Sequence, residues 1–243
     1  MGTVYVHLDA RADLRVFSEG VPPDVRWVRP RIPVRWGCMS VVWAALGGLR
    51  AVMRESPDYV HLLSGHDYPL CGADAMRSLL AGGGEFIEVR ARPEEASRYE
   101  RFHLDQWLSC ARLRRPVERV LNAALAPRTP PLEIHLGSGW FTVTGALARY
   151  FVAFCDRRPD VMRFFRLTRV PDEMLFQSIA MQSPFRHALA GHNLRFIDFD
   201  GGPHPRALTL DDVPALARSG HLFARKFVPR TSDGALDAID ALA

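Results

Sequence analysis

Short, β-rich apolar runs alternate with helix-like segments along this 243-residue chain. Such a run forms a strand when turn residues bound it, and the amphipathic stretches between the runs form helices. Strands are therefore predicted at 3–8, 59–63, 85–89, 132–136 and 194–199. Helices are predicted at 40–54, from 142 to about 155, from 171 onward and at 210–218. The alternation is typical of an α/β fold, and the length suits one domain over residues 1–243.

The chain is basic, with a formal net charge of +4 and a pI near 9.1, but its basic residues are scattered from Arg11 to Arg230. Scattered positive charge favours a small anionic ligand. A nucleic-acid partner is not expected, because it would require a clustered basic face interleaved with aromatic residues. The densest group, Arg112, Arg114 and Arg115, is typical of a solvated helix face.

The basic residues are almost all arginine: of the 31 lysines and arginines in the chain, Lys226 is the only lysine. Lysine carries a compact charge on a flexible stem that can follow a moving phosphate oxygen, whereas arginine presents a rigid planar fork. Taken by itself, the survival of one lysine by chance in an arginine-biased gene is the better explanation of this composition.

Four cysteines are spread along the chain, and none forms a Cys-x-x-Cys pair: Cys38, Cys71, Cys110 and Cys155. Neither a zinc knuckle nor a redox motif is predicted, and buried free thiols are expected. The most apolar stretch, 41–49, is too short to span a bilayer, and no signal-peptide pattern opens the chain. We therefore expect a cytoplasmic protein without a transmembrane segment, and the arginine-rich composition suggests a bacterial source.

A polar loop at 64–69 follows the predicted strand at 59–63. Open α/β sheets bind ligands at the carboxyl ends of their strands, so this loop is a candidate site. Ser64, His66 and Asp67 are not interpreted as a hydrolase triad, because neighbours in one loop rarely aim three side chains at one proton path.

Acidic residues give two further candidates. Asp198 and Asp200 have a spacing that could hold a divalent cation at a strand end, although a solvated strand end is the stronger interpretation. Glu173 lies in the first turn of a predicted helix, where the ionised carboxylate is favoured, so it could act as a general base. Structural acids are far commoner than catalytic ones at such positions.

Six segments, in this order, resemble the core-2/I-branching β-1,6-N-acetylglucosaminyltransferase family, glycosyltransferase family 14, which includes the peptide O-xylosyltransferases. The resemblance extends from about residue 3 to 227. The segments are Val4-Tyr5-Val6-His7-Leu8-Asp9, Val34-Arg35-Trp36-Gly37, Leu62-Leu63-Ser64-Gly65-His66-Asp67-Tyr68-Pro69-Leu70, Gly137-Ser138-Gly139-Trp140-Phe141, Pro171-Asp172-Glu173 and Phe223-Ala224-Arg225-Lys226-Phe227.

The resemblance implies a GT-A-like nucleotide-sugar-binding domain, a mixed sheet flanked by helices, and the family's first strand and helix are not expected in this sequence. It further implies inverting, metal-independent transfer of N-acetylglucosamine or a related sugar from a UDP-sugar to a hydroxyl of a glycan or other acceptor, with no other cofactor. The alternative left open is a non-catalytic nucleotide-sugar-binding or glycan-binding protein derived from the same fold.

The resemblance also implies roles for individual residues. Glu173 would be the general base, and Arg225 and Lys226 would neutralise the leaving diphosphate. Gly139 stands where xylosyltransferases tend to have an aspartate, so xylose is not implied as the donor sugar. The remaining implied contacts are Arg206 at the diphosphate, Asp9, Val42 and Asp67 in the uridine pocket, and Trp36, Tyr68, Ser138 and Trp140 on the sugar and acceptor side.

Overall fold

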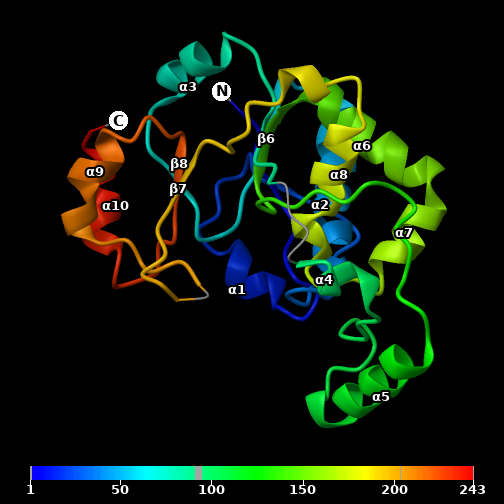
Figure 1. Cartoon of the computed structure of the whole chain (residues 1–243). Helices are drawn as coiled ribbons and strands as arrows, with labels where there is room; N and C mark the ends of the chain where they lie inside the picture. Colours follow the sequence, from blue (N-terminus) through cyan, green and yellow to red (C-terminus); the bar gives the residue numbers. More distant parts are fainter. Residues whose placement is uncertain (1, 91–94, 203, 243) are drawn as a thin grey trace.

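The computed structural model describes residues 2–90, 95–202 and 204–242, which form a larger and a smaller lobe (Figure 1). Each lobe has its own small sheet, its own helices and its own cluster of buried apolar side chains. No helix in these ranges is both long and apolar enough to cross a membrane.

The sheet of the larger lobe has the order β3–β6–β5, and both outer strands are antiparallel to β6. Its strands are β3 (Tyr59–Leu62), β5 (Phe86–Ile87) and β6 (Phe141–Thr144). The buried Glu85 carboxylate accepts hydrogen bonds from the Thr144 backbone N–H and hydroxyl, at 2.8 and 2.6 Å. The same hydroxyl accepts from the Leu147 N–H, which caps helix α6 (Gly145–Arg157) where β6 ends.

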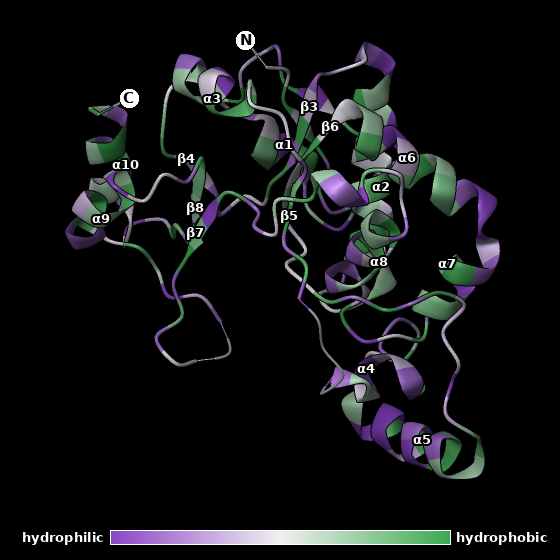
Figure 2. Cartoon of the chain, turned by 45° about the horizontal axis from the view of Figure 1, so that its top comes forward, coloured by the Kyte–Doolittle hydropathy of each residue, from purple (hydrophilic) through white to green (hydrophobic). Residues whose placement is uncertain are grey.

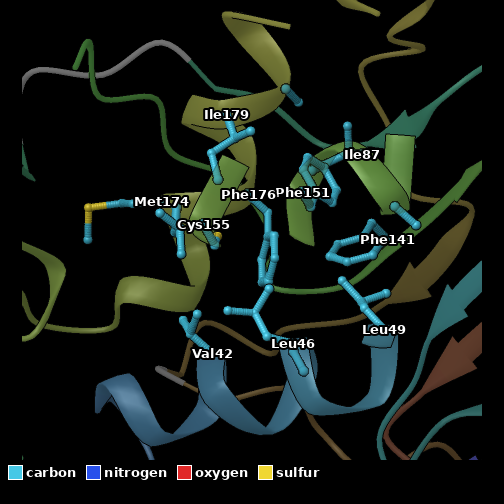
Figure 3. Close-up of a cluster of buried hydrophobic side chains, with 14 of the residues drawn as sticks. Val42, Leu46, Leu49, Ile87, Phe141, Phe151, Cys155, Met174, Phe176 and Ile179 are labelled. Carbon is cyan, nitrogen blue, oxygen red and sulfur yellow. The ribbon is translucent and has the colours of Figure 1, made fainter. Parts of the chain in front are cut away.

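Three helices cover this sheet: α2 (Met39–Val52), α6 and α8 (Leu175–Met181). On α2, Val42, Leu46 and Leu49 share one face, because residues three and four apart align on a helix. They point at a cluster of aromatic rings in the core (Figure 3). Phe141, Phe151 and Phe176 have ring centroids 5.2 to 5.6 Å apart. Each such buried side chain contributes roughly 1.5–3 kcal/mol of hydrophobic stabilisation.

The sheet of the smaller lobe has the order β4–β8–β7, with β4 antiparallel and β7 parallel to β8. Its strands are β4 (Tyr68–Pro69), β7 (Arg195–Ile197) and β8 (Phe223–Arg225). Two helices, α9 (Val213–Ala217) and α10 (Asp233–Asp240), pack against it through a second apolar cluster. A short 3-10 turn, η5 (Leu210–Asp212), precedes α9. Because β4 follows β3 after only five residues, the loop at 63–67 lies where the two lobes meet.

At the N-terminus, β1 (Tyr5–Val6) pairs in parallel with β2 (Arg26–Trp27). The other helices are α1 (Leu14–Ser18), α3 (Ala73–Leu80), α4 (Ser97–Glu100), α5 (Ala111–Ala124) and α7 (Pro159–Phe165). Single 3-10 turns are η1 (Met53–Glu55), η3 (Pro171–Glu173) and η4 (Arg186–Ala188).

The sequence-based prediction of one mixed sheet is corrected to three small sheets within the described residues. The helix at 40–54 and the strand at 59–63 are confirmed within two residues. The predicted strand at 132–136 was wrong: Leu136 makes only an isolated bridge to Arg90, and β6 forms later in the chain. Pro130 and Pro131 precede that segment, and proline cannot donate the hydrogen bonds of a central strand.

The four cysteines are free thiols. Cys38 and Cys155 are buried as expected, whereas Cys71 is half-buried and Cys110 is exposed. Burial raises the pKa of the Cys155 thiol to about 12. An inert thiol at this core position is the result, because the thiolate is the reactive form.

Candidate active site

The loop at the end of β3 is built around a buried carboxylate, that of Asp67. The Ser64 N–H and hydroxyl donate to it at 2.8 and 3.1 Å, a local turn of the kind that aspartate favours. The Asp67 side chain has no exposed surface. Phe227 N–H donates to the His66 carbonyl at 3.0 Å, which fixes this loop against the chain that follows β8.

Two arginines from neighbouring parallel strands flank Asp67. Arg195 of β7 places Nε 3.7 Å from one carboxylate oxygen, and Arg225 of β8 places Nε 3.5 Å from the other. Burial lowers the pKa of Arg195 to about 10, although the nearby Asp67 charge opposes this effect. Two guanidinium groups share one carboxylate, so the pair leaves an excess of positive charge in a poorly solvated place.

Arg225 is only partly satisfied. Its Nε and Nη1 are buried without a hydrogen-bond acceptor among the described residues, and its guanidinium lies 4.8 Å from the centroid of the Trp140 ring. A buried N–H group without an acceptor costs about 1–3 kcal/mol, so such a group is expected to meet a ligand or water. The next residue, Lys226, has no ion-pair partner among the described residues and adds a further positive charge. We call Asp67, Arg195, Arg225 and Lys226 the cationic centre.

A second group of charged side chains surrounds the turn η3. Arg98 of α4 donates through Nη2 to the Glu173 carboxylate at 2.9 Å and to the Val170 carbonyl at 3.1 Å. It also pairs with Glu95. The Glu173 side chain keeps 37% of its surface exposed, so its carboxylate remains open to a substrate. The preceding Asp172 is half-buried, and its Oδ1 atom is covered by the protein. We call Arg98, Asp172 and Glu173 the acidic centre.

Asp172 has an unusual environment within the acidic centre. Burial, and then the charge of Glu173, raise its pKa to about 6, while Arg98 opposes the shift. Its Oδ1 has no hydrogen-bond partner among the described residues. A Cβ atom at Gly139 would lie only 2.8 Å from the other oxygen, Oδ2. The Asp172 carboxylate therefore occupies space that only glycine leaves open at position 139.

The loop at 137–140 connects the two centres. Gly137 N–H donates to the Glu173 carbonyl at 2.9 Å, and the Ser138 carbonyl accepts from the buried Gln177 amide. A Cβ at Gly137 would come within 1.8 Å of the Glu88 carbonyl oxygen, so this close approach requires glycine. At the end of the loop, Trp140 stacks on Arg225. The loop thus joins Glu173 to Arg225 through a short chain of contacts.

Arg206, expected at the diphosphate, is bound by two carboxylates that belong to neither centre. It donates to Asp198 through Nε at 2.7 Å and binds Asp212 through both terminal nitrogens. These carboxylates raise its pKa further above the ordinary arginine value, with Asp212 contributing most. Arg206 already has two anionic partners and fastens the end of β7 to η5. Asp198, considered above as a metal ligand, is one of those partners.

Val42 and Tyr68 have structural positions. Val42 is fully buried in the core of the larger lobe, so its side chain cannot line a uridine pocket, and that expectation is corrected (Figure 3). The Tyr68 hydroxyl donates to Asp240 of α10 at 2.7 Å, and this hydrogen bond is the main cause of a pKa raised to about 12. Its ring packs on Phe227 at 5.7 Å. Tyr68 therefore ties β4 to α10.

Asp9 and Trp36 belong to the N-terminal segment of the larger lobe. Both Asp9 oxygens accept from Arg11, and one also accepts from the Val34 N–H at 3.0 Å. These bonds, those of Arg11 foremost, hold the Asp9 pKa well below its usual range. Trp36 has 72% of its surface exposed and meets the His204 ring edge-on at 6.3 Å. An exposed tryptophan of this kind is free to stack on a ring of a ligand.

Metal-ligating side chains gather at one other place among the described residues. His103, Asp105 and Glu118 bring ligand atoms within 4.8 Å of one another. Arg114 already pairs with both carboxylates, at 2.8 and 3.4 Å. This group lies between α4 and α5 and includes no residue of either centre.

Two hollows of about 170 and 220 Å³ lie near α9, and both are lined by Leu70, Leu216 and Ala217. Neither hollow is lined by a predicted site residue.

A family model described as core-2/I-branching enzyme matches residues 3–216. The chain belongs to this family. Within the core-2/I-branching enzymes and their relatives, it is similar to two Arabidopsis thaliana proteins. It is 33% identical over 116 residues to β-glucuronosyltransferase GlcAT14A and 30% identical over 113 residues to β-glucuronosyltransferase GlcAT14B. These alignments cover 44% and 45% of this chain but only 25% and 26% of the relatives, so the chain spans about a quarter of their length.

Three residues of the two centres were not found from the sequence: Arg98, Asp172 and Arg195. Arg195 left a faint signal, because it is the one charged residue in the apolar run at 194–197. A charge in such a run indicates a buried partner. Arg98 left none, since its partner Glu173 is distant in sequence. Asp172 belongs to the motif Pro171-Asp172-Glu173, but the sequence indicated no role for it.

Proposed function

We propose that this chain is an inverting glycosyltransferase that moves a sugar from a UDP-sugar to an acceptor hydroxyl without a metal ion. Glu173 removes the acceptor proton while that oxygen attacks the anomeric carbon. The bond from that carbon to UDP breaks as the new bond forms, and Arg225 and Lys226 neutralise the charge on the leaving diphosphate. The observation that carries the proposal is the buried Arg225 guanidinium, two of whose N–H groups find no acceptor in the described part of the chain. The adjacent Lys226 has no anionic partner in the same part.

The arrangement of the two centres supports this division of labour. Arg98 holds one oxygen of Glu173 while leaving the side chain partly exposed, as a general base requires. The loop at 137–140 joins both centres, and the Trp140 ring lies against Arg225. A sugar held between them would have the base on one side and the diphosphate on the other. Ser138 and Trp140 are the proposed sugar contacts.

Arg206 is not part of this proposal, because two carboxylates already neutralise it. We retain Asp67 in a supporting role, since its buried carboxylate positions Arg195 and Arg225 rather than facing a nucleotide. Asp9 remains proposed for the nucleotide side and Trp36 for the sugar and acceptor side. Trp36 would act through its exposed ring, and Asp9 by fixing the segment around Val34 that leads to it.

Titration calorimetry with UDP tests the metal-free part of the proposal. The excess positive charge of the cationic centre supplies what a divalent cation would otherwise supply, so UDP should bind equally well with and without EDTA. Loss of binding in EDTA, restored by magnesium or manganese, would overturn it. UDP binding without UDP release from any UDP-sugar and acceptor would instead favour a non-catalytic nucleotide-sugar-binding protein.

The proposed donor carries N-acetylglucosamine or a related sugar. Glucuronic acid is the second candidate, because both relatives named above are β-glucuronosyltransferases and the cationic centre could receive a carboxylate. A thermal-shift screen across UDP, UDP-N-acetylglucosamine, UDP-glucuronic acid, UDP-xylose and UDP-glucose separates them. The true donor should raise the melting temperature above the value with UDP alone, since ligand binding to the native state adds stability.

A further inference from the structure

Helix α5 packs against the protein with the opposite face from the one expected. An amphipathic surface helix normally turns its apolar stripe toward the core. In α5, only Arg114, Glu118, Leu121 and Asn122 are partly covered, and no residue is buried. The helix projects from the larger lobe below α4 (Figure 1).

Polar contacts hold α5 in place. The Glu118 carboxylate accepts from the Leu104 N–H at 2.7 Å. The Asn122 side chain accepts from the Phe102 N–H at 2.7 Å and donates to the Phe102 carbonyl at 3.0 Å. Arg114 pairs with Asp105 at 2.8 Å. These bonds fix which face of the helix is turned outward.

The outward face carries an apolar stripe. Leu113, Val117 and Val120 are spaced by four and three residues, so they line one side of the helix. Leu113 and Val120 are 65% and 67% exposed. Green apolar and purple polar bands run side by side on α5 in Figure 2. Water-exposed apolar residues arranged in a stripe, rather than scattered singly, mark an interaction surface.

Three arginines lie outside the stripe: at about 100° per residue, Arg112 and Arg119 are roughly a quarter turn around the helix from Val120, and Arg115 is farther round. Arg112, Arg115 and Arg119 are exposed and have no ion-pair partner within the described part of the chain. The one acid of the helix, Glu118, is turned to the protein and paired with Arg114. The outward face of α5 is therefore both apolar and purely cationic.

We propose that α5 docks the protein on an anionic lipid membrane surface. Apolar side chains on one side and arginines outside them are what a helix needs to lie in the interface, with the stripe in the acyl boundary and the cations among anionic headgroups. An apolar protein partner would leave the three arginines without counter-charges. A second copy of the chain would bring the same three positive charges together. Charge complementarity thus selects the membrane.

Cosedimentation of the full chain with lipid vesicles tests the proposal. The protein should pellet with phosphatidylcholine vesicles containing about 30% phosphatidylglycerol and remain in the supernatant with pure phosphatidylcholine. Raising the salt concentration should weaken binding, because it screens the arginines from the headgroups.

Matched variants separate the two features of the surface. Val120→Asp should lower the vesicle partition coefficient by roughly tenfold or more, because the stripe loses an apolar contact and gains a repelled charge. Val16→Asp is the control: Val16 lies on α1 and is 66% exposed, against 67% for Val120. The control should bind like wild type, and equal circular dichroism spectra should show that both variants fold.

The charge variants complete the test. Neutralising all three of these arginines to glutamine should reduce partitioning on the order of 100-fold. A control triple, Arg54→Gln, Arg163→Gln and Arg218→Gln, removes the same charge from exposed positions elsewhere and should have a much smaller effect. Equal losses in the two triples would reduce the effect to net charge and overturn a docking role for α5. Failure of wild type to bind anionic vesicles, or a dimer in solution that Val120→Asp abolishes, would also overturn it.

Discussion

The acidic and cationic centres use the same kinds of side chain in opposite proportion. The acidic centre sets Asp172 and Glu173 against one arginine, whereas the cationic centre sets two arginines and a lysine against Asp67. In the acidic centre, Arg98 binds Glu173 but leaves its carboxylate partly exposed. In the cationic centre, Asp67 lies beside Arg225 but leaves guanidinium N–H groups without an acceptor among the described residues. These incompletely paired groups, rather than the ion pairs themselves, are available to bind a substrate.

The largest difference between the two centres is expected when the proton acceptor is removed from the acidic centre. Glu173→Gln should lower the transfer rate by roughly 10²- to 10⁴-fold, the usual contribution of a positioned general base. UDP affinity should hardly change, because UDP is held by the other centre. Glu95→Gln is the matched control, since Glu95 also pairs with Arg98 and should retain most activity. Wild-type turnover in the Glu173 variant would assign this residue to structure alone.

Removing Asp67, the one carboxylate of the cationic centre, should instead lower the stability of the fold. Asp67→Ala leaves Arg195 and Arg225 buried without their shared carboxylate, which should cost about 3–5 kcal/mol of unfolding free energy. Asp198→Ala breaks a partly exposed pair with Arg206 and should cost about 0–1 kcal/mol. Urea denaturation measures both. Equal losses would show that Asp67 is no more important to the fold than an exposed acid.

The basic side chains of the cationic centre should control UDP binding. Lys226→Ala should weaken UDP binding and transfer, costing on the order of 3 kcal/mol in transition-state stabilisation. Lys226→Arg should restore it only in part, because arginine is longer and shaped for bidentate contact. Arg206→Ala, which removes a charge already neutralised by two carboxylates, should leave UDP affinity unchanged. Titration calorimetry on the three variants decides, and equal affinity in Lys226→Ala and wild type would sink the diphosphate role.

The smallest expected effect comes from the proton on Asp172. Its native pKa is raised to about 6, while an unfolded aspartate titrates near 4. The native state therefore binds more protons between these values, and unfolding free energy falls as pH rises through the window. Asp172→Asn has no proton to lose, so its stability relative to wild type should increase by about 2 kcal/mol between pH 4 and 6.

Urea denaturation at several pH values measures this difference. His61, whose pKa burial lowers to about 4, acts in the opposite sense, since its native state binds fewer protons. It is present in both proteins, so its contribution cancels in the comparison. A pH-independent difference would mean that native Asp172 titrates like an unfolded one.

Local pattern was enough to predict some of the fold. The helix that includes Val42 and the strand that includes Val60 are amphipathic or β-rich over their whole length, and both are confirmed. Strand β6 could not be found in this way. It is defined by pairing with β3 and β5, which come much earlier in the chain, and by Thr144 binding the distant Glu85. Sheet pairing of this kind is a tertiary property that short-range pattern does not contain.

The motifs of the site could be found from the sequence, but the ion pairs and hydrogen bonds between their side chains could not. Glu173 and Lys226 stood out from helix position and composition, and the resemblance assigned roles to them and added Arg225 and Arg206. Only the structure separates Arg206 from the rest, because the fold decides which arginine meets two carboxylates. Sequence reasoning identifies the residue types that a reaction needs, while availability depends on neighbours brought in from other strands. The catalytic roles themselves stay predictions until the variants above are measured.

The close approach of Asp172 to Gly139 has an evolutionary consequence. Any Cβ at position 139 would lie 2.8 Å from the Asp172 carboxylate, so this carboxylate must turn away before position 139 can carry a side chain. An aspartate at 139 would also place a second carboxylate beside Asp172, and neighbouring like charges disfavour one another. A change in donor preference that depends on a carboxylate at 139 should therefore come with a compensating substitution at 172.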